Sequence, residues 1–196
     1  FMSDTLRRAD VDIKNGITFY VASSYKASMI LLEKHITTLK ETFGATDTTN
    51  YSTFLFALAN SCEQFGNYGK AEQYYLEETF LWKSAVGENH PNYATSLNNL
   101  AVLYESLGRY AEAEQLYMQA MGIRKVQLGE NNPSFAQSLN NLAFLYESLG
   151  RYAEAETLYT QSMGIRKAQL GEDHPDYATS LNNLAVLYES LGRYAE

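Results

Sequence analysis

The chain has 196 residues, enough for one or two domains, and its 45% hydrophobic and 19% charged residues are typical of a folded protein rather than a disordered one. Its net charge of -8 disfavours nucleic acid and anionic membranes as partners, because both attract basic surfaces. The single cysteine, Cys62, cannot form an intramolecular disulfide, and the longest apolar run, 54–59, is far shorter than the about 20 residues that span a bilayer. With no apolar stretch of signal-peptide length at the start, these features predict a cytoplasmic protein without a transmembrane segment.

The first part of the chain contains two diverged copies of a repeat that becomes clear further along. When the sequence is shifted by one repeat length, Tyr51 aligns with Tyr93, and this alignment identifies a diverged unit at 45–86. A shift that is one residue longer aligns the segment from the start of the chain with this diverged unit. We therefore expect a degenerate N-terminal helix pair at 1–44.

The remaining residues are nearly exact repeats. The units at 87–128 and 129–170 are identical at 33 of 42 positions, and 171–196 match the start of the first of these units at 24 of 26 positions. The last segment therefore contains one first helix and the start of a second, which makes it a truncated unit.

Each unit is predicted to be a helical hairpin. Pro91 suits the first turn of a helix, and Asn89 or His90 can cap the free amides there. Gly108 ends this helix, a second helix begins shortly after it, and Gly129 ends that one. Apolar side chains recur at three- and four-residue steps and form the predicted core: Leu97, Leu100, Ala101, Tyr104, Leu107, Ala113, Leu116, Tyr117, Ala120, Met121, Ile123 and Leu128.

A single hairpin of this length buries too little apolar surface to offset the entropy of ordering it. Neighbouring hairpins must therefore stack and share their apolar faces. The sequence predicts an all-α solenoid of antiparallel helix hairpins.

The pattern of Leu, Ala, Tyr and Gly within the unit resembles the tetratricopeptide repeat (TPR) signature. The residues that carry it in the first clear unit are Leu97, Leu100, Ala101, Tyr104, Gly108, Tyr110, Ala113, Tyr117 and Ala120. The unit here, 87–128, is longer than the common form of this repeat. This length and the segment LGEDHPDYATSLNNLAVLY resemble the kinesin light chain branch of the TPR family. This resemblance implies a right-handed superhelical TPR array whose first helices line a concave groove for an extended peptide or a partner segment.

The polar face of each first helix is the candidate peptide-binding surface. One row of amides can hydrogen-bond successive peptide groups of a ligand, and a second row lies beside it. The candidate residues are Asn99, Asn141 and Asn183 in the first row, Asn98, Asn140 and Asn182 in the second, the polar Thr95 and Gln137, and the shallow apolar contacts Val102, Phe144 and Val186. Two alternatives remain: the asparagines can instead bridge helices across the stack, and Phe144 can pack on the next unit.

The charge of the first helices departs from that of family members that bind carboxylates or acidic peptides through basic groove residues. No Lys or Arg occurs in 90–108, 132–150 or 174–192, whereas each segment contains a glutamate. Glu105, Glu147 and Glu189 favour a neutral or basic partner, although solvated glutamates at a helix rim would give the same pattern. Basic residues near the end of the second helices are expected to interact with the helix C-terminus and with Glu130 or Glu172: Arg124, Lys125, Arg166 and Lys167.

Nothing in the sequence indicates catalysis, a metal or a cofactor. His90 and His174 occupy the same repeat position before a proline and are expected to be helix caps. Cys62 aligns with core tyrosines and is expected to be a buried thiol. No phosphate-binding, zinc-binding or paired-cysteine motif occurs.

Two functions fit these features. The first is a non-enzymatic protein interaction scaffold that binds an extended peptide in the groove. The second is a structural spacer or self-assembling rod attached to an effector domain, because near-identical repeats present near-identical surfaces. Leu181, Leu184 and Tyr188 lack the second helix of their unit, so end-to-end self-association through the truncated unit is also expected.

Overall fold

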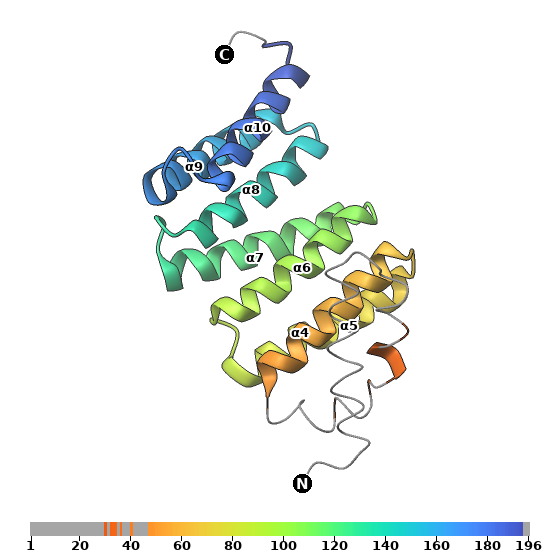
Figure 1. Cartoon of the computed structure of the whole chain (residues 1–196). Coiled ribbons are helices and arrows are strands. Elements are labelled where there is room, and N and C mark those ends of the chain that lie inside the picture. The colour runs from red at the N-terminus through yellow and green to blue at the C-terminus, as the bar shows by residue number, and fades with distance from the viewer. Residues whose placement is uncertain (1–29, 31, 35, 37–39, 41–46, 194–196) are drawn as a thin grey trace. The chain divides into compact units, whose positions relative to one another are not determined.

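The structure, a computed structural model, describes residues 30, 32–34, 36, 40 and 47–193. Within these residues the chain is helical, without strands, and it divides into two compact units, 1–88 and 89–196 (Figure 1). The helices of the first unit are α4 (Thr48–Gln64) and α5 (Tyr68–Val86), and those of the second are α6 (Pro91–Ser106), α7 (Tyr110–Leu128), α8 (Pro133–Ser148), α9 (Tyr152–Leu170) and α10 (Pro175–Ser190). The helix pair expected at 1–44 lies almost entirely outside the described residues.

The starts of the first helices follow the predicted capping pattern. In α6 and α10 the residue before the proline is a histidine, and His90 Nδ1 accepts a hydrogen bond from the Asn92 amide at 3.1 Å. In α8 an asparagine takes this position, and Asn132 Oδ1 accepts from the Ser134 amide at 2.8 Å. The cap satisfies one of the amides that the first helical turn leaves without a partner, so the prediction of a histidine cap is confirmed.

The first helices end at glycines in the left-handed conformation. At the end of α6 the Gly108 amide donates to the Glu105 carbonyl at 3.0 Å, and the Arg109 amide donates to the Tyr104 carbonyl at 2.8 Å. These two bonds close the last turn only when the glycine has a positive φ, which is 73° here. A side chain with a Cβ would be strained at this angle, which explains why a glycine recurs at every such turn.

Small and large core residues alternate between the paired helices of the second unit. α6 packs on α7, α8 on α9, and the hairpins meet where α7 lies against α8. Ala101, Ala113 and Ala120 are fully buried, and Tyr117 is buried as well. These positions confirm the predicted core. Four other predicted core residues are only partly buried, Leu107, Leu116, Met121 and Ile123, and Leu128 at the end of α7 is exposed.

Buried arginines join consecutive hairpins. Arg124 on α7 is 6% exposed. Its Nη1 donates to Ser138 Oγ at 2.8 Å and to the Ser134 carbonyl at 3.3 Å on α8, and its Nη2 donates to Thr95 Oγ1 at 3.1 Å on α6. Arg166 repeats this arrangement between α8 and α10. One guanidinium therefore connects its own first helix to the next one.

The expected role of the basic residues is thus only half correct. Lys125 and Lys167 pair with Glu130 and Glu172 at 2.7 and 2.6 Å, as predicted. The predicted pairing with Glu130 or Glu172 is wrong for Arg124 and Arg166, because their guanidinium groups bind residues of their own first helix and of the next one. In the first unit a tryptophan occupies the equivalent position, and Trp82 Nε1 donates to Ser52 Oγ at 2.7 Å.

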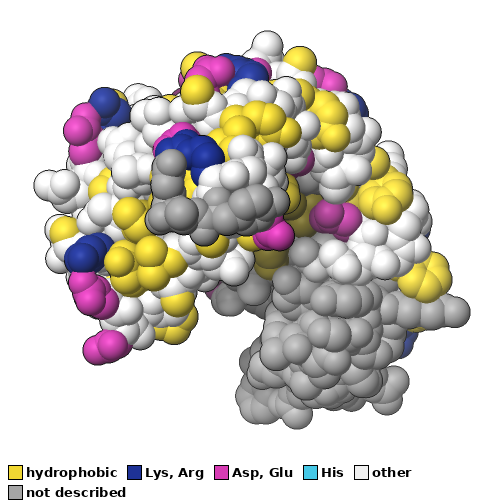
Figure 2. All heavy atoms as spheres, turned by 90° about the horizontal axis from the view of Figure 1, so that it is seen from above, with side chains coloured by type: hydrophobic (Ala, Val, Ile, Leu, Met, Phe, Trp, Pro, Cys, Tyr) yellow, Lys and Arg dark blue, Asp and Glu magenta, His cyan; other side chains and the backbone are white. Residues whose placement is uncertain are grey.

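Further ion pairs link successive second helices at the surface. Arg151 at the start of α9 binds Glu114 of α7 and Glu154 of its own helix, both at 2.7 Å. Arg193 likewise binds Glu156 at 2.9 Å. Figure 2 shows basic side chains next to acidic ones at several places on this surface, with hydrophobic groups between them. Exposed pairs of this kind contribute little individually.

The Arg124 contacts give a test of how hairpins are joined. Arg124→Met is expected to lower the free energy of unfolding by about 1–2 kcal/mol, because it removes three hydrogen bonds from a buried guanidinium. Lys125→Met is the matched control on the same helix, with an expected loss below about 0.5 kcal/mol. Urea unfolding measures both. An Arg124→Met protein as stable as wild type would mean that apolar packing alone joins the hairpins.

Candidate functional site

The first helices of the second unit present one partly exposed face, which we call the first-helix face and define by α6, α8 and α10. Of the predicted apolar contacts, Val102 and Val186 are exposed, and Phe144 is 54% exposed. Thr95 and Gln137 are also exposed, yet both accept a hydrogen bond from a buried arginine. These two side chains therefore stabilise the stack and also border the face.

The asparagines bridge neighbouring first helices. Asn141 Nδ2 donates to Asn98 Oδ1 at 2.8 Å, and Asn183 Nδ2 donates to Asn140 Oδ1 at 2.8 Å, so the same bridge occurs in two consecutive units. Gln137 Nε2 also donates to Asn141 Oδ1 at 2.7 Å. The alternative in which amides connect helices across the stack is thus realised at both junctions.

The bridges leave part of the amide rows available. The side chains of Asn99 and Asn182 form no hydrogen bond with the described residues, and one side-chain N–H of Asn141 remains after its bond to Asn98. Asn140 is different, because it is only 9% exposed. The expectation that both rows are open to solvent is wrong for this residue, since the bridge from the next helix covers it.

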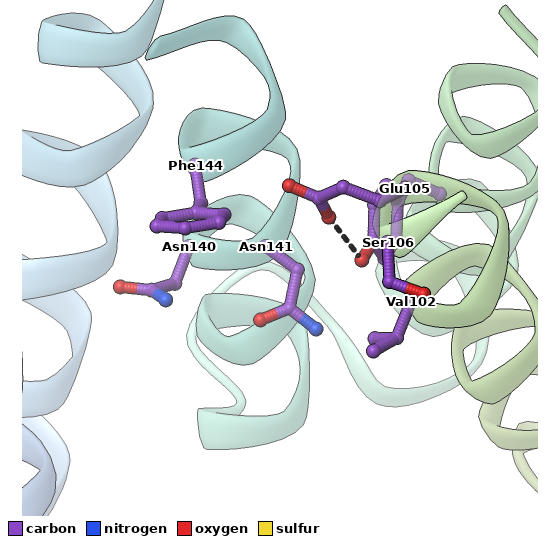
Figure 3. A pocket seen from close by; sticks show the side chains of 7 residues that line it. Val102, Glu105, Ser106, Asn140, Asn141 and Phe144 are labelled. Atoms are coloured by element: carbon purple, nitrogen blue, oxygen red, sulfur yellow. Dashed lines mark hydrogen bonds between the residues drawn. The ribbon is translucent and has the colours of Figure 1, made fainter. Parts of the chain in front are cut away.

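A pocket of about 280 Å³ opens between α6 and α8. Four predicted residues line it, Val102, Asn140, Asn141 and Phe144, together with Glu105, Ser106 and Tyr117. Figure 3 shows Phe144 and the two asparagines extending from α8, and Val102, Glu105 and Ser106 from the facing α6. The structure therefore gathers part of the predicted surface into a hollow that repeat spacing alone could not define.

The Glu105 carboxylate is the charged group of this pocket. Tyr117 Oη donates to its Oε2 at 2.8 Å, while its Oε1 is buried and accepts no hydrogen bond from the described residues. Burial raises the pKa of Glu105, and the bond from Tyr117 opposes that rise. A solvated glutamate at the helix rim is therefore the wrong description of Glu105.

The tyrosine partner could have been found in the sequence as a recurring spacing. Tyr117 donates to Glu105, and Tyr159 Oη donates to Glu147 Oε2 at 3.0 Å with the same separation along the chain. The repeat pattern assigns these tyrosines to the core, which is correct for their rings. Their hydroxyl groups, however, reach the first-helix face and fix the carboxylates.

The uncovered side of α10 is smaller than predicted. Leu181 is 45% exposed, but Leu184 is buried, and Tyr188 Oη donates to Glu156 Oε1 at 3.1 Å. Of the three residues expected to seek another surface, only Leu181 is left with a large exposed apolar side chain.

The other reactive groups of the described residues include one cysteine thiol. Cys62 is fully buried, which raises the pKa of its thiol to about 11. Within the described ranges, no cluster of three or more His, Cys, Asp or Glu side chains has metal-binding geometry. Among the same residues, no helix combines the length and apolar character needed to cross a membrane.

The raised pKa of Glu105 predicts the effect of Glu105→Gln on stability. The folded chain binds more protons than the unfolded one between pH 4.5 and the raised value, so wild-type stability falls as the pH rises through this window. Glutamine keeps an acceptor for Tyr117 without the charge. Urea unfolding should show Glu105→Gln to be more stable at pH 7, by less than about 1 kcal/mol. The difference should vanish below pH 4.5, and a variant that is less stable at both pH values would contradict the argument.

Comparisons with known proteins agree with this architecture. No curated protein sequence gives a significant match. Among solved structures, BtubC (BKLC) from P. vanneervenii has a TM-score of 0.69 at 23% identity, with 95% of this chain and 71% of that chain covered. A putative kinesin light chain from Podosopora anserina with nearly identical TPR-like repeats has a TM-score of 0.74 at 22% identity, with 95% and 88% covered. The apo form of RapI has a TM-score of 0.78 at 14% identity, with 95% and 65% covered.

At these identities the likeness concerns the fold, and it confirms the resemblance to kinesin light chain-type TPR structures and the all-α solenoid of helical hairpins. The profile of the tetratricopeptide repeat family matches residues 51–125 and 134–196, which is more than half of the chain. The chain therefore belongs to the tetratricopeptide repeat family, whose members generally serve as protein interaction scaffolds.

Proposed function

We propose that this chain is a non-catalytic, cytoplasmic scaffold that binds an extended segment of a partner protein along the first-helix face. The observation that carries the proposal is the α6–α8 pocket, which is lined by the exposed Phe144, by Val102 and by the amides of Asn140 and Asn141. An apolar hollow bordered by a few polar groups is the usual form of a site for a protein side chain.

The amide rows supply the contacts that an extended backbone needs. Asn99, Asn182 and the remaining N–H of Asn141 are available to peptide groups. The bridge between Asn98 and Asn141 holds the Asn141 side chain in place, so less entropy is lost when a ligand orders that amide. Backbone contacts of this kind carry little sequence preference, and the exposed apolar residues supply the side-chain contacts.

Charge supports a neutral or basic partner. Neither Lys nor Arg occurs in α6, α8 or α10, and the glutamates of these helices give the face a negative potential. The net charge of -8 likewise opposes binding to nucleic acid or an anionic membrane.

The test is binding of an immobilised peptide library to the whole chain, followed by comparison of two charge insertions. Phe144→Arg is expected to weaken the selected peptides at least about tenfold, because it removes an apolar wall of the pocket and places a cation where it can occupy the hollow and pair with Glu105 in place of a ligand. Val126→Arg is the matched control on α7, where the side chain is 78% exposed and lies away from the pocket lining. Equal binding by wild type and Phe144→Arg would remove the first-helix face from the function.

A second candidate function is a structural rod that associates end to end. It is supported by Leu181, which is 45% exposed and lines a second hollow on α10 together with Met163 of α9. If this surface joins two copies, wild type should form dimers or larger species in sedimentation experiments, and Leu181→Glu should be monomeric. A monomeric wild type at high concentration would exclude self-association through this surface.

A further inference from the structure

The α6–α8 pocket combines apolar walls with one carboxylate. Val102 and Phe144 form its apolar sides, and Figure 3 shows the Glu105 carboxylate directed from α6 toward the side chains of α8. Lysine and arginine have the matching form, a long apolar stem that ends in a cation. An apolar ligand side chain would leave Glu105 Oε1 without a donor, and an acidic one would be repelled by the carboxylate.

The carboxylate has unused hydrogen-bonding capacity on one oxygen. Glu105 Oε2 accepts from Tyr117, whereas Oε1 is buried without a donor from the described residues. A buried acceptor in this condition costs free energy until a donor reaches it. The hydrogen bond from Tyr117 also fixes the carboxylate, so a donor meets a positioned group and not a mobile side chain.

No cation of α6 or α8 competes for this carboxylate. Glu105 and Glu147 are the charged residues of these two helices. The nearest arginines in sequence have other partners: Arg109 binds Glu112 at 2.5 Å and lies 3.8 Å from the Tyr104 ring centroid, and Arg124 is buried at the hairpin junction. The charge at the pocket is therefore complemented only by a group from outside the helices that form it.

The arrangement differs between consecutive units despite their near identity. Glu147 also accepts a hydrogen bond from a tyrosine, but neither of its carboxylate oxygens is buried without a partner. The residue on α10 that is equivalent to Phe144 of α8 is Val186. The larger ring of Phe144 supplies one wall of the α6–α8 pocket. Glu147 therefore provides a matched control for Glu105 within the same molecule.

We propose that the α6–α8 pocket is a subsite for one cationic side chain, lysine or arginine, of the bound segment, with the stem between Val102 and Phe144 and the cation at Glu105. This inference rests on the proposed function, because the cation arrives as part of a peptide on the first-helix face. Its role is to set the register of that peptide, since the amide rows recur in every unit and cannot distinguish one unit from the next.

The test uses fluorescein-labelled peptide pools that differ only at a fixed central residue. The centre is lysine, arginine, norleucine or glutamate, and the flanking positions draw on the same mixture of Ala, Leu, Ser and Gln. Fluorescence anisotropy with the whole chain gives the affinities. We expect the lysine and arginine pools to bind about tenfold more tightly than the norleucine pool, and the glutamate pool to bind most weakly.

Three variants then locate this preference. Glu105→Gln should abolish it, Glu147→Gln should retain it, and Phe144→Val, which installs the residue of the equivalent positions 102 and 186, should weaken it. The urea unfolding described above shows whether Glu105→Gln is folded. Equal binding of the lysine and norleucine pools overturns this inference alone. Equal losses in Glu105→Gln and Glu147→Gln overturn it as well, because the preference would then reflect overall charge. If wild type binds no pool, the proposed function fails together with this inference.

Discussion

The contact between one hairpin and the next is the interaction on which the second unit depends. A hairpin cannot bury its apolar face alone, so α7 must lie against α8. Met121 of α7 packs there against the cluster that Phe135, Ala136 and Leu139 form with Ile165 of the same following hairpin. Arg124 adds directional hydrogen bonds to this apolar contact, and they reach side chains on both α6 and α8. Apolar packing supplies most of the free energy, and the guanidinium restricts how the two first helices can shift along each other. This restriction helps to place the side chains of α6 and α8 on the first-helix face relative to each other.

Features set by local structure could be predicted from the sequence, whereas features set by contacts between units could not. The caps and glycine ends depend on residues close together along the chain, so His90 and Gly108 were identified correctly. Arg124 was misplaced because a cation near a helix end has the same local pattern whether it faces solvent or the next hairpin. The burial of Asn140 depends on Asn183, which is a neighbour only after stacking. The pocket beside Phe144 is likewise a property of two helices and has no signature in either.

The amide bridges change the meaning of the repeated asparagines. A row of free amides would be a ladder for any extended backbone, but Asn98 and Asn141 already satisfy each other in part. Their first effect is to hold α6 and α8 in register, and their remaining N–H groups are presented at fixed positions. Stabilising the stack and contacting a ligand are therefore compatible roles, because an amide has more hydrogen-bonding capacity than one bridge uses. Alanine at one of these positions would remove both roles together, which is why charge insertion at Phe144 separates them more cleanly.

Near-identical units create a difficulty for a scaffold that must bind one segment in one place. A ligand that contacts only repeated features gains the same free energy after a shift of one whole unit, so the repeats by themselves give affinity without a defined register. A single substitution removes this equivalence when it changes a wall of a pocket, as Phe144 does relative to Val102 and Val186. Under the proposed binding mode, the carboxylate of Glu105 would give that altered position a charge preference as well as a shape. In the proposed scaffold, specificity would thus arise from the place where one unit differs from its neighbours, while the repeated residues would provide the stability and the general affinity on which that difference acts.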